Sequence, residues 1–530
     1  MKKLTGLTIC IVILFTLFSF TVMAEGNFGG TLKVGITSDL DSLNPIISND
    51  RIGSWLLNNV YPTLYLMNED AVKIPYVAEE INTSKDGMTV TVKLVEGLKW
   101  EDGEPFTVED IYYSGKVLQD QGLKYGNIFE NVEKIDMPDD YTIIYHLKQP
   151  FPAFMGKFGF WCRIAPEHIF SDYDNLKTFP NKKPVGLGPF VITQYKKGQY
   201  YIMESVDEWP LAEQGRPYLD RIIWRIYPDV NTMVLALKSG EIDLTAKDIP
   251  HMAAQELEKD SEFTVVQNES LGYVYMGFNF RNKYLKNKEL REAIANAVDR
   301  QKIIDIALEG DGSLIDTPVS PVYPEILNPD VKLPNYNVEN AREILSNAGY
   351  EDTDDNGFIN DPETGEDVSL EITYDGHDIY LRKTVQILTA NLNEIGISIS
   401  LKPLEKATYI NLVFNENDFD INVGGWGIID PLNDSLYALF YSENYLNFMG
   451  MDSPEIDQYT KDIRYATTKQ EQIDAVYKFQ EKMNEIKPVV PLYVQNYNFA
   501  YSNDFAGFTV YPSDLKGLVD PQSLVNVYKK

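Results

Sequence analysis

Residues 352–363 carry oxygen-bearing groups at the spacing of a calcium-binding loop of the EF-hand type. Gly357 would allow the sharp turn at the sixth position of this loop, and Ile359 would anchor it through an apolar side chain. Ca²⁺ takes six to eight oxygen ligands, so the pattern predicts a structural Ca²⁺ site. The predicted ligands are Asp352, Asp354, Asn356, Phe358 through its carbonyl, Asn360 through water, and Glu363.

The same segment is also compatible with an acidic surface β-turn. A helix-like stretch precedes it, but the alternating stretch after it is typical of a strand, where an EF-hand would have a second helix. Pro362 beside Glu363 is unusual for the last ligand position. Both interpretations stay open from the sequence.

Motifs of the common hydrolases are missing from the sequence, which contains no Gly-x-Ser-x-Gly, no His-Glu-x-x-His and no phosphate-binding loop. The 79 acidic residues make chance carboxylate pairs inevitable, so glycosidase chemistry cannot be inferred from them. We therefore expect a protein without catalytic activity, and a secreted hydrolase is the remote alternative. The four histidines show no metal-ligand spacing: they are His146, His168, His251 and His377.

The N-terminus predicts an export signal. Lys2 and Lys3 precede an apolar run from Leu4 to Met23, and the small residues around Ala24 suit cleavage after it, so 1–24 is the expected signal peptide. An uncleaved membrane anchor is the alternative, because about 20 apolar residues can cross a bilayer. We expect a periplasmic or extracellular protein.

The net charge of −32 argues against binding to nucleic acid, which selects basic surfaces. Loss of the signal would also remove Cys10 and leave Cys162 as the single cysteine. No internal disulfide is then available, so stability must come from a hydrophobic core, which a chain of this length can supply.

The elements that would position these groups are strands and helices in alternation. Residues 88–94 alternate between apolar and polar side chains, as in a half-buried strand, and Thr107 begins a helix-capping pattern. Apolar residues recur at helical spacing within 289–303 and 385–395. Gly396 ends the second helix, and an alternating strand follows. These patterns predict an α/β protein with mixed sheets flanked by helices.

Six segments in this order resemble the landmarks of the family 5 extracellular solute-binding proteins of ABC importers, the oligopeptide-, dipeptide- and nickel-binding type. The first contains a strand, a turn and a helix start, and the second is the motif Gly-Leu-Gly-Pro-Phe. Together they span nearly the whole chain after the signal. The six segments are 76–111, 186–190, 237–244, 287–304, 339–350 and 489–497.

The resemblance implies a two-lobed, periplasmic-binding-protein-like fold of type II with an extra inserted subdomain and a hinge between the lobes. It implies hinge segments near 270–273 and 490–493, and a monomer. Lobe I would comprise 25–60, 171–270 and 490–530, the inserted subdomain 61–170, and lobe II 271–489.

The same resemblance implies that the protein captures a peptide between the lobes and delivers it to an ABC-transporter permease in the membrane. Relatives of the peptide-binding type meet the peptide's amino group with an Asp shortly after a Gly-Trp pair. Here Gly425 and Trp426 precede Asp430, which we expect to be that partner, with Asp434 as a second candidate. Asp430 as a structural helix cap is the alternative.

An oligosaccharide is the competing ligand, because sugars stack on aromatic rings and the chain has 34 Tyr and 6 Trp. Packing in the core is the alternative role for each aromatic residue. The aromatic candidates for ligand contact are Trp55, Trp161, Trp426, Tyr273, Tyr275, Tyr493 and Tyr497.

Overall fold

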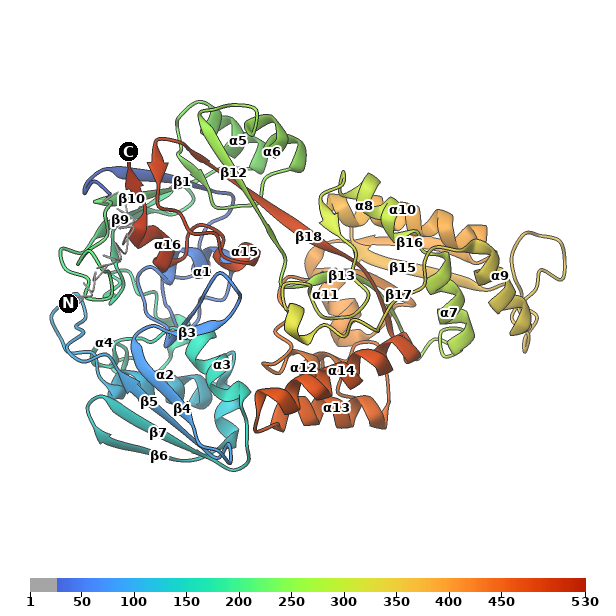
Figure 1. Ribbon diagram of the computed structural model, residues 1–530, viewed down its shortest axis with the longest axis horizontal. Helices are drawn as coiled ribbons and strands as arrows, with labels where there is room; N and C mark the ends of the chain where they lie inside the picture. The colour runs from blue at the N-terminus through green and yellow to red at the C-terminus, as the bar shows by residue number, and fades with distance from the viewer. Residues whose placement is uncertain (1–25) are drawn as a thin grey trace, which may run out of the picture.

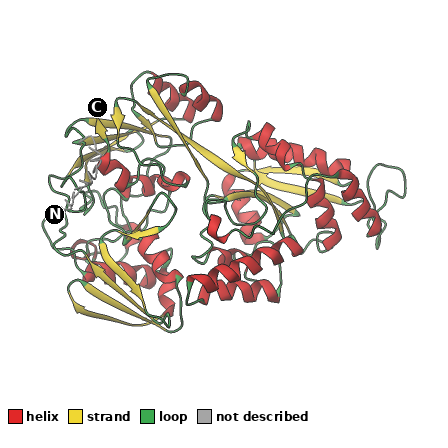
Figure 2. Ribbon diagram, in the orientation of Figure 1, coloured by secondary structure: helices red, strands yellow, loops and turns green. Residues whose placement is uncertain are grey.

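The computed structural model describes residues 26–530, apart from the side chains of residues 514 and 516, so the expected signal segment lies outside it. The chain forms two lobes, and both termini lie in the same lobe (Figure 1). Helices flank the sheets in each lobe (Figure 2), which confirms the predicted α/β class. Among the described residues, no helix combines the length and the apolar character needed to cross a membrane.

Lobe I, which holds the termini, contains one half of a 12-stranded sheet. β1 lies between β10 and β11 and is parallel to both, while β8, β9 and β10 form an antiparallel meander. The elements of this half are β1 (Thr31–Ile36), α1 (Arg51–Leu57), η2 (Leu176–Thr178), β8 (Phe190–Lys196), β9 (Tyr200–Ser205), β10 (Arg221–Ile226), α5 (Val230–Lys238), β11 (Leu244–Thr245), α6 (His251–Leu257), β12 (Phe263–Glu269), β19 (Phe505–Ala506), α15 (Ser513–Lys516), α16 (Pro521–Asn526) and β20 (Tyr528–Lys529).

A second part of lobe I carries its own four-stranded antiparallel sheet, in the order β4-β5-β7-β6. It occupies the bottom left of Figure 1, beside α2 and α3. Its elements, with the small hairpin β2–β3 that precedes it, are β2 (Tyr65–Met67), β3 (Lys73–Pro75), β4 (Ala78–Thr83), β5 (Thr89–Leu94), α2 (Val108–Asp120), η1 (Gly126–Asn131), β6 (Val132–Asp139), β7 (Thr142–Leu147), α3 (Ala153–Trp161) and α4 (Glu167–Phe170).

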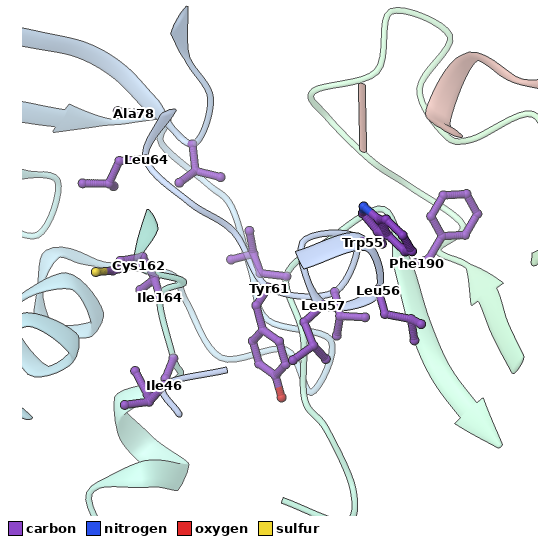
Figure 3. Close-up of a cluster of buried hydrophobic side chains, with 14 of the residues drawn as sticks. Ile46, Trp55, Leu56, Leu57, Tyr61, Leu64, Ala78, Cys162, Ile164 and Phe190 are labelled. Carbon is purple, nitrogen blue, oxygen red and sulfur yellow. The ribbon is translucent and has the colours of Figure 1, made fainter. Parts of the chain in front are cut away.

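A single hydrophobic core joins these two parts of lobe I. Trp55 on α1 and Tyr61 after it are buried near Phe190 of β8, and residues from the other part, including Ile164, pack in the same cluster (Figure 3). Cys162 is a buried free thiol in this core, and burial raises its pKa to about 12. The four-stranded part is therefore packed onto lobe I as one body.

Lobe II contains the other half of the large sheet, in the order β16-β15-β17-β13-β18. β15 is parallel to both β16 and β17, and α10 connects β15 to β16 as in doubly wound folds. Its elements are β13 (Tyr273–Phe278), α7 (Lys288–Ala297), α8 (Arg300–Ala307), β14 (Gly312–Ser313), η3 (Pro324–Ile326), α9 (Val338–Asn347), β15 (Ser369–Asp375), α10 (Ile379–Glu394), β16 (Ser398–Leu404), α11 (Lys406–Ile410), η4 (Asn411–Glu416), β17 (Ile421–Trp426), α12 (Ser435–Phe440), α13 (Pro454–Tyr465) and α14 (Lys469–Ile486).

The lobes are connected by strands that pass from one to the other. β18 (Val489–Ser502) is continuous: its first part pairs with β13 of lobe II, and from Asn496 onward it pairs with β12 of lobe I (Figure 1). The segment between β12 and β13 runs beside it, and Ser270 donates its backbone N–H to the Gln495 carbonyl. The two crossings therefore lie side by side near Ser270 and Gln495.

Local sequence signals account for several element ends. Thr107 caps α2 in a capping box completed by Asp110, as its pattern predicted. The helical pattern within 289–303, in contrast, forms two helices, because Val298 leaves helical geometry and Asp299 caps α8 by accepting the Lys302 N–H. Gly396 adopts a positive φ of 82° after α10, the conformation that ends a helix before a strand.

Candidate functional site

A cavity with a volume of about 1250 Å³ lies between the lobes. Lobe I contributes the start of α1, the α2–η1 connection and α3, and lobe II contributes the β17–α12 connection and the end of α13. Arg51 reaches across it: its Nη2 lies 3.7 Å from where a Cβ on Gly427 would stand. The cavity is thus enclosed by both lobes together.

Charged side chains line this cavity with a surplus of positive charge, although the whole chain carries a net charge of −32. The four acidic residues are Asp50, Glu130, Asp430 and Asp434. The six basic residues are Arg51, Lys124, Lys148, Lys157, Arg163 and Arg464. A site that concentrates cations in an acidic protein favours a ligand that carries negative charge.

The acidic side chains of lobe II are engaged by lysines of lobe I. Lys73 of β3 forms an ion pair with Asp430 Oδ2, and Asn433 donates to the same oxygen at 3.1 Å. Lys157 of α3 lies 2.5 Å from Asp434 Oδ2. The Asp434 side chain is 4% exposed, so this pair is well shielded from water. Both carboxylates therefore hold the lobes together in this structure.

Arg464 strengthens this contact between the lobes. Its Nε lies 3.3 Å from Asp434 Oδ1, although the two groups are not aligned as a hydrogen bond. Its guanidinium lies 4.0 Å from the ring centre of Tyr437 in lobe II and 4.9 Å from that of Phe151 in lobe I. A guanidinium between two aromatic rings gains cation–π attraction from both.

A cluster of cations stands on the lobe I side of the cavity. Arg163 is buried, and its Nε and Nη1 donate to Asn58 Oδ1 at 2.8 Å and to the Ser48 carbonyl at 3.1 Å. Burial lowers the pKa of Arg163 to about 10, which leaves it charged. Desolvation lowers the pKa of Lys124, and the charges of Arg51 and Arg163 lower it further.

Aromatic rings cover part of the same wall. Trp161 at the end of α3 stacks on Tyr125 with ring centres 6.3 Å apart, and the Lys124 ammonium lies 5.0 Å from the Tyr125 ring centre. Tyr445 of lobe II lines the cavity and is 79% exposed. These rings offer apolar contact to a ligand between the charged groups.

Comparison with known proteins decides what this two-lobed architecture is. Residues 74–448 match the sequence profile of the bacterial extracellular solute-binding proteins, family 5 Middle, and this match covers well over half of the chain. The chain belongs to this family. Its members bind solutes for ABC importers, so the interlobe cavity is the site expected for a solute.

The relatives and solved structures agree over nearly the full length. The chain is 28% identical to the oligopeptide-binding protein AppA of Bacillus subtilis over 91% of this chain and 90% of that one. It is 26% identical to the glutathione-binding protein GsiB of Escherichia coli over 90% of this chain and 92% of that one.

Among solved structures, AppA from Bacillus subtilis in complex with a nonapeptide superposes with a TM-score of 0.77, at 26% identity, covering 96% of this chain and 100% of that one. The ABC transporter substrate-binding protein CtaP from Listeria monocytogenes gives a TM-score of 0.83, at 25% identity, over 95% of this chain and 100% of that one. The predicted two-lobed, type II fold is therefore confirmed.

The structure of this family member brings some predicted contact residues to the cavity and keeps others away. Trp161, Asp430 and Asp434 line it. Asp430 is no helix cap, because α12 begins after Asp434, but its carboxylate is taken by Lys73. A ligand amine that binds Asp430 would therefore have to compete with Lys73, which the sequence did not indicate.

The predicted aromatic contacts largely belong to the core, which corrects their assignment to the cavity. Tyr273, Tyr275 and Tyr493 are buried, with at most 2% exposed, and none of them lines the cavity. Trp426 is half-buried and stacks on Tyr275, with ring centres 6.1 Å apart; neither Trp426 nor the exposed Gly425 lines the cavity. Tyr497 packs against the core of lobe I. The tyrosines Tyr273, Tyr275 and Tyr493 lie in strands, which aromatic residues favour, and pack in the core instead of facing a ligand.

Sequence reasoning missed the basic residues of the cavity. Arg163 directly follows Cys162, and its positive charge was the only signal in the sequence that could have indicated it. Lys124 and Tyr125 lie in the short α2–η1 connection, which has no motif. Contacts of η1 with α2 and α3 bring these parts of the chain together.

The predicted calcium loop lies between α9 and β15, at the end of lobe II furthest from lobe I (Figure 1). Asp352 accepts the backbone N–H groups of Asn356 and Gly357, at 3.1 and 2.8 Å, so it closes the turn by itself. Asn360 is buried and hydrogen-bonds to Thr353 and Asp367. Among the side chains that the structure describes, no group of three or more of His, Cys, Asp or Glu is gathered as a metal site would require.

Proposed function

We propose that this protein captures a peptide in the interlobe cavity and delivers it to an ABC-transporter permease. The observation that carries the proposal is the cavity itself, enclosed by both lobes in a family of solute-binding proteins. Its volume of about 1250 Å³ exceeds the roughly 300–1,000 Å³ of ordinary small-molecule sites, which suits an extended ligand. The AppA structure with a nonapeptide supports the same ligand class.

Closure of the lobes over the ligand would be the working step. The hinge would lie where the chain crosses near Ser270 and Gln495, between lobe I (25–60, 171–270 and 490–530, with 61–170 inserted) and lobe II (271–489). A ligand closes such a hinge by making more contacts in the closed state than in the open one. The solute is released unchanged, so no catalytic residue is required.

Export would place the protein outside the cytoplasm, where it would meet solutes before they are imported. We propose that residues 1–24 are a signal peptide cleaved after Ala24, and that the mature protein works as a monomer outside the cytoplasm. Edman or mass-spectrometric sequencing of the secreted protein would then give Glu25 as its first residue.

The test of the peptide ligand is a native mass spectrum of protein purified gently from its producing cells, followed by denaturation and identification of what is released. We expect one equivalent of a mixture of short peptides, held without cleavage. A ladder of hexose masses would instead support the oligosaccharide alternative. Steady conversion of an added peptide into products would point to a hydrolase.

Calcium binding by the loop at 352–363 stays a prediction with its own test. Ca²⁺ sites of extracellular modules have Kd values of roughly 10⁻⁴–10⁻³ M, so 10 mM Ca²⁺ would stabilise the loop by about 1–3 kcal/mol. We expect Ca²⁺, but not Mg²⁺, to raise protection of this loop from hydrogen exchange, and Asp354→Asn to remove the effect. Equal protection with Ca²⁺ and with EGTA would show that the segment is only a surface turn.

A further inference from the structure

The two carboxylates nearest a ligand's expected amino end are already neutralised across the cleft. Lys73 and Lys157 come from lobe I, whereas Asp430 and Asp434 belong to lobe II. The pairs form only when the lobes are closed, which is also when a ligand is enclosed. A ligand ammonium could reach these carboxylates only by displacing a lysine that is tethered to the opposite lobe.

Two of the cations on the lobe I wall, Lys124 and Arg163, form no ion pair with lobe II among the described residues. Lys124 makes no ion pair with a carboxylate of the described residues, and its ammonium lies over the Tyr125 ring. Arg163 uses Nε and Nη1 for neutral acceptors, while its Nη2 makes no hydrogen bond within the described part of the chain. The negative charges of Asp41 and Asp50 raise the pKa of Arg163 without an ion pair. Both Asp50 oxygens accept backbone N–H groups.

A second, small cavity marks the place where these cations meet. It has a volume of about 20 Å³ and is lined by Ser48, Asn49, Lys124, Tyr125, Trp161 and Arg163 among others. The same six residues also line the large cavity, so the small void adjoins it. A void of this size holds one water-sized polar atom. A carboxylate oxygen there would have an ammonium and a guanidinium beside it.

We propose that the cleft holds its ligand by a carboxylate, placed between Lys124 and Arg163, and that Asp430 and Asp434 serve as closing contacts between the lobes, so that a free α-amino group is not required. This inference rests on the proposed peptide ligand and makes it more specific. The substrate class is then peptides with a free carboxylate, including those whose N-terminus is blocked.

The test compares one peptide sequence in three forms by calorimetry, using a peptide identified by mass spectrometry from the purified protein. The forms are unmodified, N-acetylated and C-amidated, with no acidic side chain in the sequence. We expect acetylation to change Kd by less than about 3-fold and amidation to raise it by at least about 10-fold, because a charged hydrogen bond is lost. If acetylation weakened binding of the peptide and amidation did not, the inference would be overturned and the proposed peptide function would stay intact.

Two variants and one control variant separate the roles of the charged groups. Lys124→Met should weaken the unmodified peptide by at least about 10-fold and the amidated peptide hardly at all, whereas Lys116→Met, an exposed lysine on α2, should change neither. Asp430→Asn should weaken free and acetylated peptides by the same factor, since its effect is on closure. If Asp430→Asn harms only the free-amine form, the amine role stands and the inference fails. If no peptide of any form binds, the proposed function fails first.

Discussion

Replacing Gly156 by valine is expected to weaken ligand binding by about 10- to 100-fold while the protein stays folded. Gly156 lies on α3 of lobe I, and a Cβ there would stand 2.0 Å from the side-chain oxygen of Asn433 in lobe II. Overpacking of this kind costs about 1–3 kcal/mol. The clash exists only in the closed state, so the cost falls on closure and thus on affinity.

The fold itself should tolerate the change, because glycine within a helix is unfavourable by about 0.5–1 kcal/mol relative to alanine. The measurements are Kd by calorimetry and compactness by small-angle scattering with saturating ligand. The matched control is the double variant Gly156→Val/Asn433→Ala. It should bind the ligand with the same affinity as the single variant Asn433→Ala. Undiminished affinity of Gly156→Val on its own would show that the lobes do not need to approach this closely.

Replacing Arg291 by methionine is expected to lower the free energy of unfolding of lobe II by about 3 kcal/mol or more. Arg291 on α7 is 3% exposed. Its Nη1 donates to the carbonyls of Leu285, Lys286 and Asn287, and its Nε and Nη2 donate to that of Ile486 at 3.1 and 2.7 Å. Methionine fills the space but leaves these acceptors without a donor, and hydrogen bonds to charged groups are worth about 1.5–3 kcal/mol each.

Ile486 ends α14, where a positive charge is also favoured by the helix dipole. For a lobe of this size, the loss corresponds to a fall of about 6–12 °C in melting temperature. Thermal unfolding followed by calorimetry, with hydrogen exchange at α7 and α14, would measure it. Arg382→Met, at an exposed arginine on α10 of the same lobe, should leave the melting temperature and the hydrogen exchange at α7 and α14 unchanged. A melting temperature equal to that of the parent protein would mean that water replaces the lost donors.

Much of the fold could be predicted, because its signals are local. The alternation within 88–94 became β5, the pattern at Thr107 became a capping box, and the helix–glycine–strand order around Gly396 became α10 and β16. Each of these depends on side chains a few residues apart. The break between α7 and α8 was missed because apolar spacing continues across Val298, while the cap at Asp299 interrupts the helix.

The cavity could be predicted only in part, because its lining comes from segments far apart in the chain. Trp161 and Asp430 stood out by residue type and by resemblance, and both reach the cavity. Tyr273 and Tyr493 stood out for the same reason, but they belong to strands whose two faces are covered, so they are buried. The partners Lys73 and Lys157 could not be assigned, since nothing near either lysine in the sequence indicates that it will face Asp430 or Asp434.

The continuous strand β18 has a consequence for how the chain is made. Lobe II needs its first residues to complete the sheet beside β13, and lobe I needs its last residues to pair with β12. Both pairings join segments that are more than 200 residues apart, and such long-range pairing is slow. A chain that emerges N-terminus first therefore cannot complete either lobe until its final segment has appeared. The order of synthesis therefore keeps the chain incompletely folded almost until its last residues are made, and an incompletely folded chain can pass through a narrow channel.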